Sequence, residues 1–164
     1  MKTILKTTAT AILLALGASA WAQSAAVDVQ GAWARATVQG QKATGAFMKL
    51  TAKENAKLVS ASSPVAGVVE IHEMKMEENV MKMRAIPSLD LPAGKAVELK
   101  PGGYHVMLMD LKEPLKKETT VPITLVVKDD KGVESKVELT VPVSLKSPSG
   151  MGGMGHQHGH GHAH

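Results

Sequence analysis

Residues 70–111 read EIHEMKMEENVMKMRAIPSLDLPAGKAVELKPGGYHVMLMDL, and both the strand pattern and the chemistry of the chain converge on this stretch. It contains the two histidines that precede the C-terminal tail, His72 and His105. It also contains six of the ten methionines: Met74, Met76, Met81, Met83, Met107 and Met109. The chain has no cysteine. Imidazoles and thioethers without a thiolate form a soft ligand set that suits Cu(I).

The segment 104–111 alternates with the period of two that is typical of a strand. Side chains two residues apart lie on the same face of a strand. One face would therefore carry His105, Met107 and Met109, and the other Tyr104, Val106 and Leu108.

The segments 66–75 and 80–86 are predicted to pair as a hairpin. With Glu77-Glu78 at its tip, His72 would lie opposite Met83, and Met74 opposite Met81. Opposed side chains have Cβ atoms about 4.5–5.5 Å apart, which is close enough for two of them to hold one metal ion. No Asn-Gly pair is present to fix this register.

The chain after the leader has the length of one domain, with short β-like runs between turn signals. We expect strands near 28–37, 44–53, 56–62, 66–75, 80–86, 95–99, 104–111, 119–128 and 133–143. This pattern predicts an all-β, two-sheet sandwich. The expected core comprises Trp33, Phe47, Leu50, Leu58, Val69, Ile71, Val106, Leu108, Ile123, Leu125, Val137, Leu139 and Val141.

The spacing His72-x10-Met83-x21-His105-x-Met107 resembles the metal motif of the periplasmic PCuAC copper chaperones. The stretches GAWARAT (31–37), ASSPVAGVVEIHEM (61–74) and LKPGGYHVMLMDL (99–111) are also similar to that family. The resemblance implies a cupredoxin-like Greek-key β-sandwich. It also implies that the four motif residues bind Cu(I). The sequence matches the family motif at all four positions.

The remaining methionines have two interpretations, because methionine is also a common filler of gaps in apolar cores. Met74, Met81 and Met109 are candidate auxiliary ligands or members of a soft hydrophobic rim. Met76 is expected at the rim and Met48 in the core.

Residues 1–22 have the features of a signal peptide, with Lys2 and Lys6 before a short apolar run. Ala20-Trp21-Ala22 predicts cleavage before Gln23, and no cysteine follows for lipid attachment. The predicted product is a periplasmic protein without membrane insertion. Its copper-binding sandwich domain would span 23–146.

Residues 147–164 read SPSGMGGMGHQHGHGHAH and predict a flexible, disordered tail. Histidine-rich tracts bind divalent metals, so the tail is a candidate Cu(II) site. Its candidate ligands are Met151, Met154, His156, His158, His160, His162 and His164. A cloning tag is the alternative, but tags usually have an unbroken histidine run.

Several classes of function find no support in the sequence. The formal net charge of +4 falls to +2 without the leader, which is too mild to indicate nucleic-acid binding. No nucleophile triad or phosphate loop is present, and a blue-copper carrier would need a cysteine thiolate. A copper oxygenase with an N-terminal histidine brace would need histidine in place of Gln23. We therefore expect a protein that is not an enzyme.

Three functional hypotheses remain. The first is a copper chaperone. The family resemblance implies delivery to the CuA centre of cytochrome c oxidase, sometimes alongside a Sco-type thiol protein. The second is a sequestration protein that gives copper tolerance without a specific client. The third and weakest is an interaction sandwich whose methionines have no role in metal binding.

Overall fold

The computed structural model describes residues 26–148, and these form strands and turns. The strands are β1 (Val27–Arg35), β2 (Ala43–Ala52), β3 (Ala56–Ser62), β4 (Ala66–Glu77), β5 (Val80–Ala85), β6 (Leu89–Leu91), β7 (Ala96–Leu99), β8 (His105–Leu111), β9 (Thr120–Asp129) and β10 (Glu134–Ser144). The sequence predicted every strand except β6, which is too short to show a period. None of the described residues forms a helix of the length and apolarity that a membrane crossing needs.

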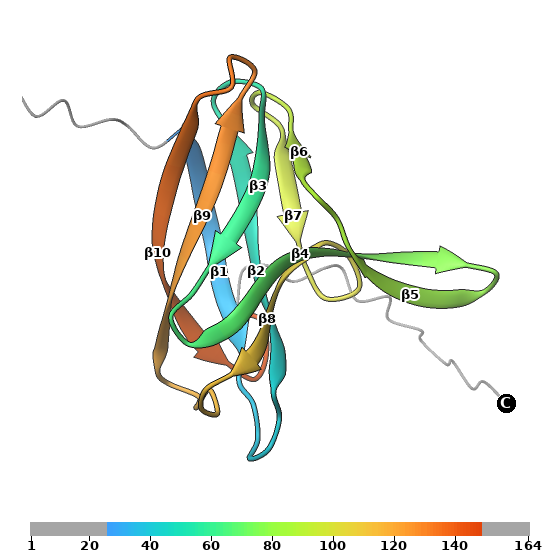
Figure 1. The fold of residues 1–164 in the computed structure, drawn as a ribbon, viewed down its shortest axis with the longest axis vertical. Coiled ribbons are helices and arrows are strands. Elements are labelled where there is room, and N and C mark those ends of the chain that lie inside the picture. Colours follow the sequence, from blue (N-terminus) through green and yellow to red (C-terminus); the bar gives the residue numbers. More distant parts are fainter. Residues whose placement is uncertain (1–25, 149–164) are drawn as a thin grey trace, which may run out of the picture.

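The strands follow one path, β5-β4-β8-β2-β1-β10-β9-β3-β6, and β7 pairs with β2 beside β8. This path folds into two layers, and a short parallel pairing of β1 with β10 at Ala34 and Arg35 joins them (Figure 1). Strands far apart in the sequence, such as β4 and β8, lie side by side. The predicted all-β, cupredoxin-like fold is confirmed.

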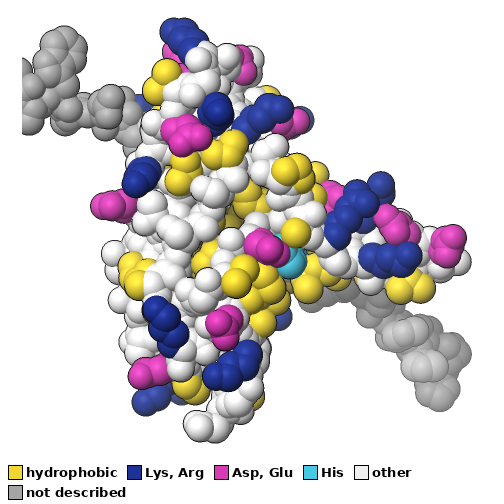
Figure 2. Space-filling view, in the orientation of Figure 1, with side chains coloured by type: hydrophobic (Ala, Val, Ile, Leu, Met, Phe, Trp, Pro, Cys, Tyr) yellow, Lys and Arg dark blue, Asp and Glu magenta, His cyan; other side chains and the backbone are white. Residues whose placement is uncertain are grey.

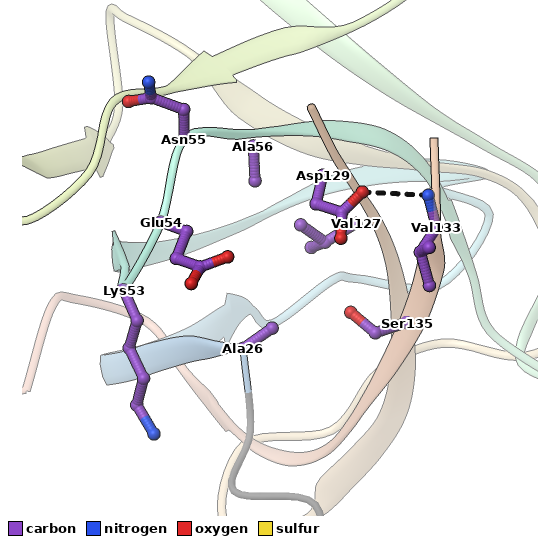
Figure 3. Close-up of a pocket in the computed structure, with 9 residues that line it drawn as sticks. All are labelled: Ala26, Lys53, Glu54, Asn55, Ala56, Val127, Asp129, Val133 and Ser135. Carbon is purple, nitrogen blue, oxygen red and sulfur yellow. Dashed lines mark hydrogen bonds between the residues drawn. The ribbon is translucent and has the colours of Figure 1, made fainter. Parts of the chain in front are cut away.

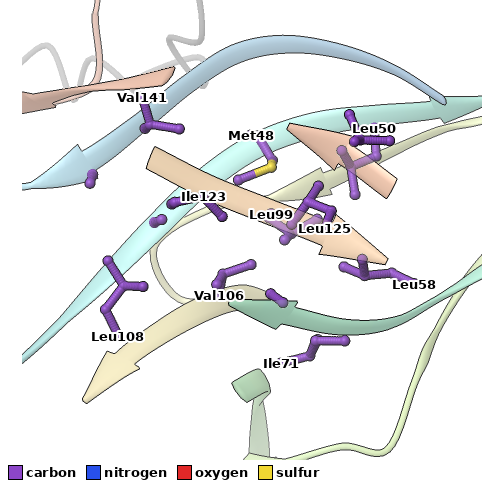
Figure 4. Close-up of a cluster of buried hydrophobic side chains, with 14 of the residues drawn as sticks. Met48, Leu50, Leu58, Ile71, Leu99, Val106, Leu108, Ile123, Leu125 and Val141 are labelled. Atoms are coloured by element: carbon purple, nitrogen blue, oxygen red, sulfur yellow. The ribbon is translucent and has the colours of Figure 1, made fainter. Parts of the chain in front are cut away.

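Aliphatic side chains fill the space between the layers (Figure 4). Met48, Leu50, Val106 and Leu108 alternate along β2 and β8 with residues of the outer face, and all four are fully buried. The expected burial of Met48 is therefore confirmed. This alternation places Val106 and Leu108 inside and leaves the other face of β8 to His105, Met107 and Met109.

The expected burial of Trp33 and Phe47 is confirmed, and they lie apart from the aliphatic cluster between the layers. The two residues lie opposite each other on β1 and β2. Their neighbours Ala34 and Ala46 belong to the core, so the aromatic rings lie on the outer face of the sheet.

The β4–β5 hairpin projects from the sandwich (Figure 1). Its predicted register is wrong by one residue pair, because the tip is Glu78-Asn79 rather than Glu77-Glu78. Both tip residues have positive φ angles, 51° and 63°, as a type I′ turn requires. Asparagine tolerates this conformation well, so Asn79 was the signal in the sequence that would have placed the turn.

Candidate metal site

The two histidines are directly opposed across β4 and β8. Their ring centroids are 5.6 Å apart, and the ring planes are inclined by 58°. His72 and His105 are only 7% and 6% exposed. The sequence did not reveal this pairing, because it depends on the contact of two strands separated by more than thirty residues.

Hydrogen bonds fix which ring nitrogens remain available. The Nδ1 atom of His105 donates to the carbonyl oxygen of Gly103 at 3.1 Å, which leaves Nε2 with a lone pair. The Nε2 atom of His72 donates to the Glu70 carboxylate at 2.8 Å. A hydrogen bond of this kind orients a histidine that binds metal through its other nitrogen.

The remaining nitrogen of His72, Nδ1, is buried and has no hydrogen-bond partner among the described residues. Buried polar atoms are rarely left without a partner. A neutral imidazole nitrogen in this state is a suitable metal ligand. His72 thus offers Nδ1, and His105 offers Nε2.

Burial lowers the pKa of His105 below its ordinary value of 6.5. The hydrogen bond to Gly103 opposes this shift, and the neighbouring His72 adds to it. His105 is therefore neutral near pH 7, which is the state in which imidazole binds metal.

Methionine residues and His105 line a cavity of about 280 Å³ on the outer face of the sheet. Its lining includes Met74, Met83, His105 and Met107. Met107 lies between Glu70 of β4 and Gly45 of β2, whereas Met83 lies opposite Met74 in the hairpin. Three of the four motif residues therefore line one cavity, and His72 adjoins it through His105.

The structure separates the other candidate ligands from one another. Met74 lies in the cavity, beside Met83. Met109 is one pair of residues further along β8, opposite Val68, and does not line the cavity. Met81 pairs with Met76 towards the hairpin tip. The proposed Cu(II) ligands of the tail, 151–164, and the leader, 1–22, lie outside the described residues.

The Phe47 ring lines the cavity. Its centroid lies 4.8 Å from that of Trp33, with the ring planes inclined by 37°, and 6.3 Å from that of His105. The guanidinium of Arg35 lies 5.5 Å from the Phe47 centroid. Gly45 makes room for the ring, because a Cβ atom there would meet Cζ of Phe47 at 2.7 Å.

Sequence reasoning missed Glu70, Arg35, Gly45 and the position of Phe47. Glu70 could have been found from the alternation, because it shares a face with His72 two residues away. The other three come from β1 and β2. Their contribution depends on the long-range pairing of β2 with β8.

A separate cavity of about 250 Å³ lies near Ala26, Asn55 and Val127 (Figure 3). The Asp129 carboxylate there accepts hydrogen bonds from the backbone nitrogens of Lys131 and Val133, each at 2.9 Å. It therefore holds the β9–β10 turn. Neither histidine nor methionine lines this cavity, so the candidate metal chemistry lies at β4, β5 and β8.

Comparison with known families gives a match over residues 27–143 to the family described as "Putative lipoprotein LpqE-like". The "Putative lipoprotein Lxx21020" of Leifsonia xyli subsp. xyli is 35% identical over 104 residues, which are 63% of each chain. The "Uncharacterized protein RP573" of Rickettsia prowazekii is 34% identical over 65% of this chain and 62% of that protein. The chain thus matches less than two thirds of the length of these curated relatives.

Solved structures give similar matches. Apo-DR1885 from Deinococcus radiodurans is 34% identical over 90% of this chain and 99% of that protein, with a TM-score of 0.54. CuI-DR1885 is 36% identical over 76% and 82%, with a TM-score of 0.55. The apo PCuAC domain from PmoF1, at 23% identity over 73% and 95% and a TM-score of 0.56, supports the fold alone.

Proposed function

Because the chain belongs to the LpqE-like, PCuAC-type family, we propose that it is a periplasmic copper chaperone with a Cu(I) site at His72, Met83, His105 and Met107. The predicted membership of the PCuAC family is confirmed. One observation supports the site: a buried pair of opposed histidines adjoins a cavity lined by methionine residues.

The donor set favours Cu(I). Thioethers are soft ligands and imidazoles are intermediate, and both bind without a negative charge. The proposed donor atoms are Nδ1 of His72, Nε2 of His105 and the sulfurs of Met83 and Met107. Support for this oxidation state comes also from the solved CuI-DR1885 structure, which is the Cu(I) form of a protein that is 36% identical.

The site has a closed and an open side, as transfer of a metal requires. The two imidazoles are almost fully buried, whereas the Met83 residue is 49% exposed. An incoming ligand can therefore approach the metal from the hairpin side and replace an exposed thioether first. This accessibility favours a chaperone over a closed storage site.

The proposed client is the CuA subunit of cytochrome c oxidase, with or without a Sco-type thiol protein. Family membership agrees with the prediction that the chain is not an enzyme. It also agrees with export. Cleavage before Gln23, the domain limits 23–146 and 147–164, and Cu(II) binding by the tail remain part of this proposal.

Metal transfer to a purified CuA domain tests the proposal. Copper-loaded protein should give up Cu(I) to the apo CuA domain, and the Met83→Leu/Met107→Leu variant should fail to hold it. Met109→Leu is the matched control, since Met109 shares the face of Met107 but lies outside the cavity. Tight Cu(I) binding without transfer would instead favour sequestration.

A further inference from the structure

The methionine face of the hairpin extends beyond the cavity. Met74 lies opposite Met83, and we call this pair the inner rung. Met76 lies opposite Met81, one step nearer the tip, and we call this pair the outer rung. Opposed residues share a face, and so do residues two apart, so all four side chains lie on one side of the hairpin.

Packing does not explain the outer rung. Met76 is 58% exposed and Met81 is 43% exposed, so neither fills a gap in a core. Strand β5 is exposed along its whole length. Exposed strands favour β-branched and aromatic residues, yet methionine occupies all four positions of the two rungs. Neither core packing nor strand propensity therefore explains methionine at these exposed positions.

The opposite face of the hairpin is charged. Arg84 contacts Glu73 at 2.6 Å, and Lys82 contacts Glu77 at 3.3 Å. Charged groups of both signs are visible along the projecting hairpin, with a histidine at its base (Figure 2). Exposed ion pairs add little stability. Their effect here is to keep ammonium, guanidinium and carboxylate groups on the face away from the sulfurs.

We propose that the outer rung, together with a sulfur of the inner rung, is a second Cu(I) site through which the metal enters and leaves the cavity. Opposed side chains have Cβ atoms about 4.5–5.5 Å apart. Flexible methionine side chains can therefore turn two sulfurs towards one ion. This second site rests on the proposed function, because both sites bind Cu(I).

The two rungs are close enough to exchange a metal ion. Two residues along a strand span about 7 Å, and each methionine can turn its sulfur towards the neighbouring rung. Cu(I) moves between the rungs when one Cu–S bond forms and another breaks. Thioethers carry no ionisable proton, so this step requires neither proton transfer nor a change in oxidation state.

Methyl NMR on the mature full-length protein tests this second site. Methionine ε-methyl groups are labelled with ¹³C and assigned with single Met→Leu variants, and Cu(I) is added without oxygen. The Met76 and Met81 signals should shift together, at a different stage of the titration from that of Met107, which belongs to the main site alone. Met48 is buried in the core and should not shift.

The possible results separate the two proposals. If Met76 and Met81 stay fixed to saturation, or shift in the same stage as Met107, the second site is wrong while the main site stands. If Met83 and Met107 stay fixed, the proposed function is wrong, whatever the outer rung does.

Transfer kinetics supply a second readout. The Met76→Leu/Met81→Leu variant should release Cu(I) to a soluble chelator several-fold more slowly, with unchanged affinity of the main site. Val80→Leu is the matched control, because Val80 is an exposed apolar residue of the same hairpin at 58% exposure. Equal release rates in the wild type and the double variant would overturn the role in transfer.

Discussion

The Glu70 carboxylate accepts a hydrogen bond from Nε2 of His72 at 2.8 Å, and the other ring nitrogen of His72 is buried without a partner among the described residues. The two residues are neighbours on one face of β4. This contact fixes the imidazole and leaves Nδ1 as the nitrogen that the proposed Cu(I) site would use.

Glu70→Gln should weaken Cu(I) binding. The amide is a poorer acceptor than a carboxylate, and loss of such an outer contact typically costs a metal site about 10–100-fold in affinity. Competition with a Cu(I) chelator measures the change. Glu73→Gln is the matched control, because Glu73 lies on the opposite face of the same strand and pairs with Arg84. Equal losses in both variants would contradict the orienting role of Glu70.

Gly45→Ala should destabilise the protein and disturb the cavity. The added methyl group would meet the Phe47 ring at 2.7 Å, so the ring must move. Overpacking of this kind costs about 1–3 kcal/mol, measurable by urea denaturation. The Gly45→Ala/Phe47→Leu double variant removes the clash and should lose less stability than the two single effects combined. Additive losses would show that the two residues do not interact.

Changes at the hairpin tip should act through the type I′ turn. Glu78 and Asn79 both have positive φ angles. Glu78→Gly should stabilise the hairpin, whereas Asn79→Val should destabilise it by about 1–2 kcal/mol. Amide hydrogen exchange of β4 and β5 reports the effect. Unchanged exchange in Asn79→Val would show that the turn has a different conformation.

The apo protein should lose stability as the pH falls below 6.5. Burial lowers the pKa of His105 in the folded state, so the unfolded chain takes up its proton first. The contribution of neutral His105 to the free energy of unfolding is complete above its unfolded-state pKa of 6.5. It is lost as the pH falls through the lower pKa of the folded state. His105→Gln should flatten this part of the pH profile in urea denaturation. Parallel profiles for the two proteins would contradict the assignment.

The local sequence pattern was sufficient to predict the strands and the face of the sheet on which each side chain lies. His105, Met107 and Met109 alternate with core residues, and that period of two is written in the sequence. The hairpin register was displaced by one pair, yet the methionines stayed on one face. A shift of two residues does not change which side a side chain occupies.

Contacts between distant strands could not be predicted in the same way. The opposition of His72 and His105 depends on β4 lying beside β8, and the position of Phe47 in the cavity depends on β2 lying on the other side of β8. Loop closure and packing of the whole sandwich determine these neighbours. The four-residue spacing suggested a shared site without supplying its geometry.

Because the β4–β5 hairpin projects from the sandwich, the proposed ligands belong to two parts of the structure, the sheet and the hairpin. His105 and Met107 belong to β8, which is held between β4 and β2 in the sheet, whereas Met83 lies on an arm that extends past the body. A small rotation about the base of the arm would displace Met83 and leave the β8 ligands in place. A partner protein that binds the hairpin could thus move the Met83 sulfur away from the metal without unfolding any part of the core.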